Sequence, residues 1–471
     1  MGSFVPTSET VVPTFKTPWI ETPLVESAAL SRAAGCRIFL KLENVQPSGS
    51  FKSRAMGNQI LSHLRKPENA NRRVHFYASS GGNAGLAAVC AARSLGYPCT
   101  VVVPLSTKPL MIEKLKAAGA ADVIRHGETF FEAGSYMKEV IMQNSSGDEE
   151  NLAKIALHPF DNEPIWEGNS TIIDELEKQL PAPSGSEEED RYRGKALPLD
   201  AVLCSVGGGG LLNGLVMGLE KRRTQKQTVQ SGSSTTGHAY MDITAPETTP
   251  PRAIPTAPSP IHLLAIETDG TDSLAAAIAH NALVSLPKIT SQATSLGAIR
   301  VSETTFQYAV SPPPGIKVHS AVITDAEAAR GVLRLADDER LLVELACGVC
   351  VEAAIGDTAV AAAEAAASAR AVAVSQGAKK RKLAPTEVSS DRDEGYGDDR
   401  SISTGNETDP EMEPEVDTST KASSPVLNSK LKQLVPDLNE QSRVVIVVCG
   451  GSNVTIDMAS EYRRLLSEGW V

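Results

Sequence analysis

One lysine, Lys52, lies in a short polar loop that directly follows an apolar, strand-like segment. Turn-forming residues occupy positions 48–50, and the segment 54–65 that follows is compatible with a helix. We therefore expect Lys52 near a helix N-terminus, where the positive end of the helix dipole lowers the pKa of an amine and attracts anions. An amine with a lowered pKa suits Schiff-base chemistry, although a surface lysine in a serine-rich turn would show the same local pattern.

Four consecutive glycines, Gly207 to Gly210, separate a strand-like apolar run at 201–206 from a helix-like run at 211–220. Glycines leave backbone N–H groups unobstructed, and N–H groups at a helix N-terminus bind phosphate. The alternative is a glycine hinge that binds no ligand. A hinge rarely stands between such a strong strand and helix, so the pattern favours a phosphate site.

Three further loops or strand ends carry groups that could bind a ligand. The small-residue loop 79–85 lies between a predicted strand and a predicted helix, and Cys449 ends the last apolar strand, where α/β sheets place ligand contacts or core residues. Glu267 ends another apolar strand, 261–266, and no basic residue follows within ten positions. A buried carboxylate is costly unless it is paired or binds a metal.

The elements that must position these groups alternate between strands and helices. The apolar run 100–104 is typical of a strand that is buried on both faces of a parallel sheet. The alternation of such runs with helical segments predicts an α/β protein with a doubly wound parallel sheet. At 471 residues, the chain is long enough for two or three domains.

Two segments have a composition that does not fit a packed core. Residues 222–260 are rich in Ser, Thr, Pro and Gly, and 379–438 is basic at its start and then acidic, so we predict two disordered, low-complexity insertions. Residues 386–420 carry twelve acidic and two basic side chains, which accounts for −10 of the net charge of −12. The basic tetrapeptide Lys379 to Lys382 reads either as a nuclear signal or as a solvated helix end.

The rest of the chain is nearly neutral, which argues against nucleic acid or an anionic membrane as the main partner. No run approaches the roughly 18 apolar residues of a membrane span. The seven cysteines are scattered, as expected in a reducing compartment, and we predict a soluble cytoplasmic protein. Cys347 and Cys350 have the spacing of a redox or zinc motif, but no second pair accompanies them, which favours two packed thiols.

Taken together, several motifs resemble the catabolic L-serine/L-threonine dehydratases, which are pyridoxal-phosphate (PLP) enzymes of fold type II, the fold shared with the tryptophan synthase β subunit. The motifs occur in the order of that family and span about residues 17–465. The matching segments are 41–44, 48–54, 79–85, 166–168, 205–212, 286–291, 295–298, 344–348 and 449–453.

The resemblance implies roles for individual residues. Lys52 would carry PLP covalently and later serve as general base, while Phe51 would pack on the pyridine ring. Asn83 would contact the ring hydroxyl, and Cys449 would face the ring nitrogen. The phosphate would be held by Gly207, Gly208, Gly209, Gly210 and Leu211. The substrate carboxylate would be received by Ser80, Gly81, Asn83 and Ala84. A monovalent cation, K+, would be bound by Glu267, Thr271, Leu296 and Ala298.

The implied reaction is β-elimination of L-serine to pyruvate and ammonia, and of L-threonine to 2-oxobutyrate. The implied architecture is a small α/β domain, 46–152, and a large one formed by 1–45 and 153–471, with PLP in the cleft between them and a homodimer as the assembly. Cysteine and threonine synthases share the fold and remain an alternative. A non-catalytic PLP-binding scaffold is a third interpretation, against which the intact Lys52 and Cys449 speak.

Overall fold

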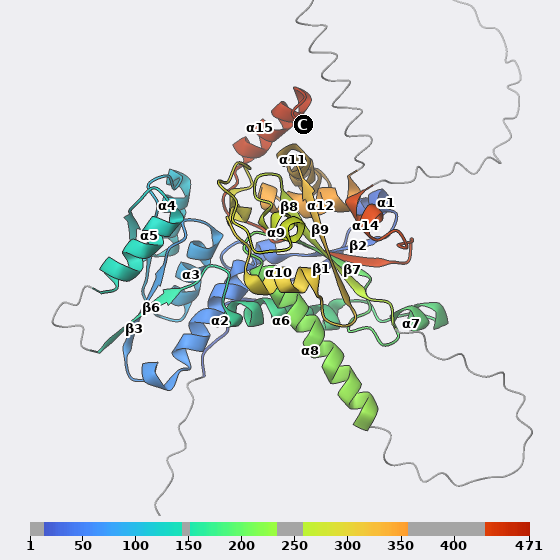
Figure 1. Cartoon of the computed structure of the whole chain (residues 1–471), viewed down its shortest axis with the longest axis horizontal. Helices are drawn as coiled ribbons and strands as arrows, with labels where there is room; N and C mark the ends of the chain where they lie inside the picture. The colour runs from blue at the N-terminus through green and yellow to red at the C-terminus, as the bar shows by residue number, and fades with distance from the viewer. Residues whose placement is uncertain (1–13, 144–150, 233–257, 357–428) are drawn as a thin grey trace, which may run out of the picture. The chain divides into compact units, whose positions relative to one another are not determined.

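The computed structural model describes residues 14–143, 151–232, 258–356 and 429–471, and it confirms the predicted α/β class (Figure 1). Most strands are parallel and alternate with helices along the chain. Most of the predicted insertion 379–438, including Lys379 to Lys382, lies outside the described residues.

The larger sheet has six strands in the order β1-β2-β10-β7-β8-β9. Only β1 pairs in the antiparallel sense, and strands β7 and β10 are buried at every residue, as apolar runs with helices on both sides require. The strands are β1 (Leu24–Glu26), β2 (Arg37–Lys41), β7 (Ala201–Ser205), β8 (Ile261–Thr268), β9 (Ile316–Ile323) and β10 (Arg443–Val447).

The smaller sheet has four parallel strands in the order β5-β4-β3-β6. They are β3 (Arg73–Ala78), β4 (Cys99–Val103), β5 (Asp122–Arg125) and β6 (Leu152–Leu157). Because β6 pairs with β3 along its whole length, the smaller sheet extends past residue 152, where the sequence placed a domain boundary. The boundary itself remains a prediction.

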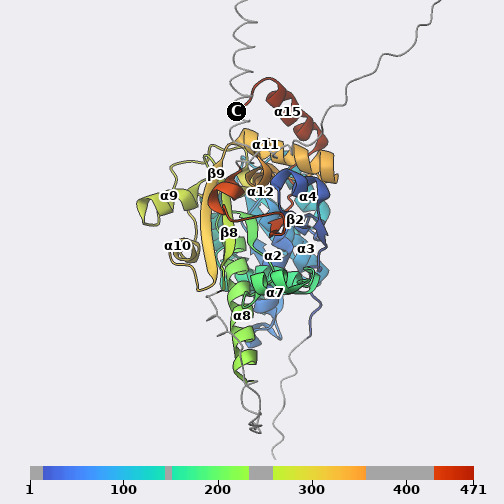
Figure 2. The same ribbon diagram turned by 90° about the vertical axis from the view of Figure 1, so that its right-hand side faces the viewer.

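Helices cover both sheets. Helix α12 packs against α11 and against strands β7 and β8, and α11 also contacts α15, as Figure 2 shows from the side. Helix α6 packs against α8 and α2. The first helices are α1 (Ala28–Ala34), α2 (Lys52–Leu64), α3 (Asn83–Ser94), α4 (Pro109–Ala118), α5 (Phe130–Tyr136), α6 (Glu163–Gln179) and α7 (Ser186–Tyr192). The later helices are α8 (Gly210–Gly232), α9 (Ser273–His280), α10 (Glu303–Val310), α11 (Asp325–Arg334), α12 (Leu345–Ile355), α14 (Lys430–Leu434) and α15 (Ile456–Ser467).

Both predicted insertions, 222–260 and 379–438, include residues that the structure places in helices. Helix α8 continues through Gly232, and Arg222 ties the beginning of this extension to α6 through ion pairs with Asp174 (2.9 Å) and Glu177 (2.6 Å). This polar end of the helix has no apolar periodicity to reveal it. Helix α14 lies inside the second segment and is anchored by the fully buried Leu431.

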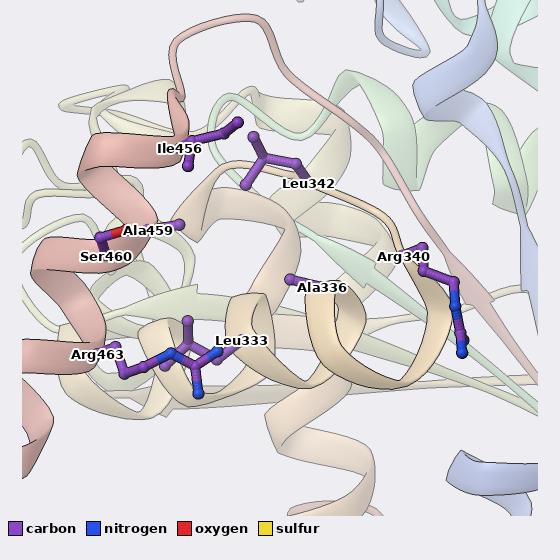
Figure 3. A pocket seen from close by; sticks show the side chains of 8 residues that line it. All are labelled: Leu333, Ala336, Arg340, Leu342, Ile456, Ala459, Ser460 and Arg463. Carbon is purple, nitrogen blue, oxygen red and sulfur yellow. The ribbon is translucent and has the colours of Figure 1, made fainter.

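Among the described residues, no helix is both long and apolar enough to cross a membrane. A groove of about 270 Å³ lies between α11, the turn that follows it, and α15 (Figure 3). It is lined by Leu333, Ala336, Arg340, Leu342, Ile456, Ala459, Ser460 and Arg463, and includes none of the residues predicted to do chemistry.

Candidate active site

Lys52 is the first residue of α2, which confirms the predicted helix start. Its Nζ donates a hydrogen bond to the carbonyl of Pro159 at 2.8 Å and lies 5.1 Å from the ring centroid of Phe51. Burial of the amine lowers the pKa of Lys52 to about 8, against a small opposing effect of Cys449. The pKa is lowered as predicted, and its main cause is the loss of water around the amine.

A buried ion network holds the first turn of α2 in place. Arg54 is fully buried and pairs with Glu43 at 2.8 Å and with Glu175 on α6 at 2.5 Å. Lys41 on β2 completes the network through Glu175 at 2.5 Å. Burial alone would raise the pKa of Glu175, but its bonds to Arg54 and Lys41 lower it. The lysine loop is thus tied to α6 and to strand β2 of the larger sheet.

The loop after β10 lies directly against the lysine loop. The backbone N–H of Phe51 donates to the carbonyl of Cys449 at 3.2 Å, and Ser50 forms an isolated bridge with Gly450. The Cys449 thiol is buried and lies 3.5 Å from the hydroxyl of Ser205, which ends β7. The structure therefore brings Phe51, Lys52 and Cys449 together although they are far apart in the sequence.

The glycine loop joins β7 to α8. Gly209 has a positive φ of 92°, and a Cβ there would lie 1.9 Å from the hydroxyl oxygen of Thr305, so only glycine fits. Within the described part of the chain, the N–H groups of Gly207, Gly208 and Gly209 donate to no protein acceptor. Three free N–H groups at the start of a long helix form a cradle for an anion.

The loop that holds the Lys52 amine also packs on the glycine loop. A Cβ at Gly208 would lie 2.2 Å from the ring of Phe160, and one at Gly210 would lie 2.5 Å from the Phe160 carbonyl. Because Phe160 follows Pro159, the same short loop contacts both the amine and the cradle. Leu211 is buried in the first turn of α8 behind them.

The loop between β3 and α3 places its small residues at a helix start. Asn83 is the first residue of α3; its Oδ1 accepts from the N–H of Ser452 at 3.0 Å, and its Nδ2 donates to Glu344 at 3.1 Å. Gly81 packs so closely on Thr107 that a Cβ would lie 2.7 Å from the Thr107 methyl. Ser80 and Ala84 belong to the same loop and helix start, so the four residues predicted to receive a carboxylate lie together.

Glu267 is fully buried near the end of β8 and has no ion-pair partner among the described residues. Its two carboxylate oxygens accept hydrogen bonds from the N–H groups of Leu274 (2.8 Å) and Ala275 (2.9 Å) at the start of α9. Burial raises the pKa of Glu267 to about 8, although the two N–H donors act in the opposite direction.

The other residues predicted to bind a cation make local contacts. The hydroxyl of Thr271 lies 2.6 Å from that of Thr268, and the carbonyl of Leu296 accepts from the N–H of Ala298 at 2.7 Å. Leu296 also lies against Gly207, with 3.0 Å between its carbonyl oxygen and a Cβ built there. In the described ranges, no cluster of three or more His, Cys, Asp or Glu residues could hold a metal.

The sequence assigns no role to four residues that connect this site, although Ser295, Glu344 and Ser452 lie in motifs that carry the family resemblance. Pro159 holds the Lys52 amine, and Glu344, Ser295 and Ser452 surround Asn83. Three of them lie in or next to polar loops, and Glu344 interrupts an apolar run, but nothing in the sequence says which distant side chain each one meets. Cys347 and Cys350 are buried free thiols on α12, as the interpretation of packed thiols expects.

Comparison with known proteins places this geometry in a family. A family model described as "Pyridoxal-phosphate dependent enzyme" matches residues 16–377. An L-serine dehydratase of Saccharomyces cerevisiae (strain AWRI1631) is 36% identical over 330 residues, which cover 70% of this chain and 83% of the yeast protein. An L-serine dehydratase/L-threonine deaminase of Mus musculus is 36% identical over 334 residues, which cover 71% of this chain and 82% of the mouse protein.

Among solved structures, the fungal L-serine ammonia-lyase from Rhizomucor miehei aligns with a TM-score of 0.62 and 23% identity. The alignment covers 95% of this chain and 99% of the fungal chain, and at this identity it concerns the fold. The family match spans more than half of the chain, and the yeast and mouse relatives are covered over most of their length. This chain therefore belongs to the family of pyridoxal-phosphate dependent enzymes.

Proposed function

We propose that this protein is an L-serine ammonia-lyase that converts L-serine to pyruvate and ammonia and also accepts L-threonine, giving 2-oxobutyrate. The observation that carries the proposal is the position of the Lys52 amine: it starts α2, donates to Pro159 in the loop that packs on the glycine cradle, and follows Phe51, whose N–H contacts Cys449. Its lowered pKa of about 8 suits a covalent anchor and a base. The names of the yeast and mouse relatives support the choice of serine and threonine as substrates.

The residues present fit the cofactor of the family. The free N–H groups of Gly207, Gly208 and Gly209 suit its phosphate, with Gly210 and Leu211 continuing the cradle into α8. Phe51 contacts Cys449, which we place opposite the ring nitrogen, and Lys52 contacts the loop that packs on this cradle. Bound PLP would supply an electron sink for negative charge at the substrate Cα.

The chain's own groups then have distinct tasks. The Lys52 amine takes the proton from the substrate Cα, and a pKa near 8 leaves part of it neutral at physiological pH. The loop formed by Ser80, Gly81, Asn83 and Ala84 holds the substrate carboxylate at the start of α3, where the helix dipole favours an anion. The Cys449 thiol offers the ring nitrogen no carboxylate charge, which favours elimination over transamination.

We further propose that K+ binds at Glu267. A fully buried carboxylate without an ion-pair partner among the described residues supports this, because a cation would compensate the charge that burial disfavours. The two N–H donors from α9 also stabilise the negative charge of Glu267, and the carboxylate oxygens keep further lone pairs that a cation could use. Backbone carbonyls near Leu296 and Ala298, with Thr271, would complete an oxygen shell suited to a large cation.

We also propose a domain boundary, a cellular location and an assembly for the protein. We keep the division into a small domain, 46–152, and a large one, and the β3–β6 pairing argues for moving the boundary past Leu157. We place the protein in the cytoplasm, which the seven free cysteines support. We expect a homodimer that acts on free amino acids, and light scattering of the purified protein measures the assembly.

Purified protein with PLP tests the function directly. Serine should yield pyruvate and threonine 2-oxobutyrate, and serine should change the visible absorbance of the bound cofactor. A cysteine or threonine synthase would instead yield little pyruvate or 2-oxobutyrate from these two amino acids. A scaffold would bind PLP with no product from either amino acid, and that result would overturn the proposal.

A further inference from the structure

Glu344 immediately precedes α12, and its side chain makes no hydrogen bond to the N–H groups of its own helix. The carboxylate is buried, with 6% of the residue exposed, and is held by donors from three other segments. Oε1 accepts from Asn83 Nδ2 at 3.1 Å and from the backbone N–H of Asn453 at 2.7 Å. Oε2 accepts from the hydroxyl of Ser295.

These contacts fix the orientation of the Asn83 amide. Its carbonyl oxygen accepts from the N–H of Ser452 at 3.0 Å, and its Nδ2 donates to a carboxylate that can only accept. A flipped amide would face an N–H donor with its NH2 group and a carboxylate with its oxygen. Asn83 is therefore locked with its NH2 group toward Glu344 and toward the hydroxyl of Ser295, which lies 3.4 Å from Nδ2.

Glu344 has no ion-pair partner among the described side chains, which distinguishes it from the network around Arg54. The charged and titratable groups around it belong to other elements. Lys108 lines the same small polar cavity, and Lys114 on α4 donates to the carbonyl of Ser452. Tyr462 on α15 has a pKa raised by burial and by the charge of Glu344.

Resting on the proposed function, we propose that Glu344 is a positioning residue that orients Asn83 toward the cofactor. It keeps the NH2 group of Asn83, rather than its carbonyl, as the group that the ring hydroxyl would meet: one N–H stays on Glu344, and the other, in a long 3.4 Å contact with the Ser295 hydroxyl, would turn to the ring hydroxyl. Glu344 also places a negative charge next to that donor. Glu344 also joins the start of α3 to the loop after Cys449, so the two sides of the ring are positioned together. It acts through Asn83 and does not itself take or give a proton in the reaction.

The variant Glu344→Gln tests this role, because a glutamine can turn its own NH2 group toward Asn83 and release the lock. We expect PLP affinity, measured by fluorescence titration of the apoprotein, to fall about tenfold, which corresponds to about 1.4 kcal/mol. The absorbance maximum of the bound cofactor should shift, and kcat should fall more than KM rises. Glu352→Gln is the matched control: this carboxylate is likewise buried but lies within α12 and pairs with Arg330 at 2.9 Å, so the variant should leave the spectrum and the PLP affinity unchanged.

A double-mutant cycle separates positioning from folding. In an Asn83→Ala background, Glu344→Gln should cause no further loss of PLP affinity and no further spectral shift. Additive effects in the cycle, or a Glu344→Gln spectrum and affinity equal to those of the parent, would overturn the proposal. If Glu344→Gln fails to fold, Ser295→Ala, which removes a partner of the same carboxylate, should show a smaller shift of the same sign. These readouts need no turnover, so a protein that binds PLP but makes no pyruvate would refute the proposed function and still test Glu344.

Discussion

Two buried polar clusters flank the candidate site, and they differ in how their charges are balanced. The cluster around Arg54 sets two cations against two carboxylates, with every ion pair at 2.8 Å or less. The cluster around Glu344 holds one carboxylate among neutral donors from Asn83, Ser295 and Asn453. Charge is balanced in the first cluster and left uncompensated by described side chains in the second.

The difference separates what holds the fold from what serves the chemistry. Removing any member of a balanced network lowers the unfolding free energy, because the remaining buried charges lose their partners. An unbalanced carboxylate is less favourable for folding, but it imposes a negative potential and a fixed acceptor on the residue next to it. We therefore expect variants in the first cluster to change stability, and variants beside the second to change cofactor and substrate chemistry.

The largest effect should come from Lys52→Ala, which belongs to neither cluster. It removes the covalent anchor and the base, so turnover of serine should fall by several powers of ten, each worth about 1.4 kcal/mol of barrier. The pyruvate assay and the visible absorbance of the purified variant measure this, and the unfolding temperature should stay close to that of the parent. Retention of more than a few per cent of the activity would refute the role of Lys52.

The comparison predicts a different result for Arg54→Met. This variant leaves Glu43 and Glu175 buried with a single remaining cation, Lys41, and should cost about 3 to 5 kcal/mol of unfolding free energy. Denaturant unfolding of the apoprotein measures the loss. Arg464→Gln, in an exposed ion pair on α15, is the control and should leave the transition unchanged. Equal transitions for Arg54→Met and the parent would contradict the structural role of the network.

A smaller effect is expected at Glu267, which is, like Glu344, a buried carboxylate without a cationic partner among the described side chains. If K+ binds there, replacing sodium by potassium at constant ionic strength should raise activity severalfold. Glu267→Gln should flatten that response and weaken PLP retention. Equal rates in both salts, with a variant that keeps its cofactor, would leave Glu267 as the carboxylate that caps α9 through Leu274 and Ala275.

The parts of this site that the sequence predicts are those that local patterns determine. Lys52 at a helix start and glycines before a long helix follow from runs of a few residues, and the structure contains both. The pairing of Asn83 with Glu344 joins residues 261 positions apart, and no local pattern encodes which distant partner a polar side chain meets. The polar end of α8 was missed for the same reason, since its ion pairs to α6 replace the apolar face that marks a helix.

The smallest effect should come from removing the low-complexity segments, since both polar clusters lie outside them. Their composition offers little apolar surface, and loop length changes the unfolding free energy by only roughly 0.6 kcal/mol per doubling. The position of the cuts should matter more than the length removed. Linkers that replace 233–257 and 376–428 keep α8 and α14 whole, so PLP binding and the unfolding temperature should be nearly unchanged.

Wider deletions test whether the end of α8 and helix α14 contribute to stability. Deleting 222–260 and 376–442 also removes the ion pairs of Arg222 and the buried Leu431. That protein should unfold at a lower temperature than the narrowly trimmed one. Loss of PLP from the narrowly trimmed protein would contradict this prediction, because it would mean that a segment with little apolar surface supports the site. If the two trims unfolded together, the end of α8 and helix α14 would add nothing measurable to the fold.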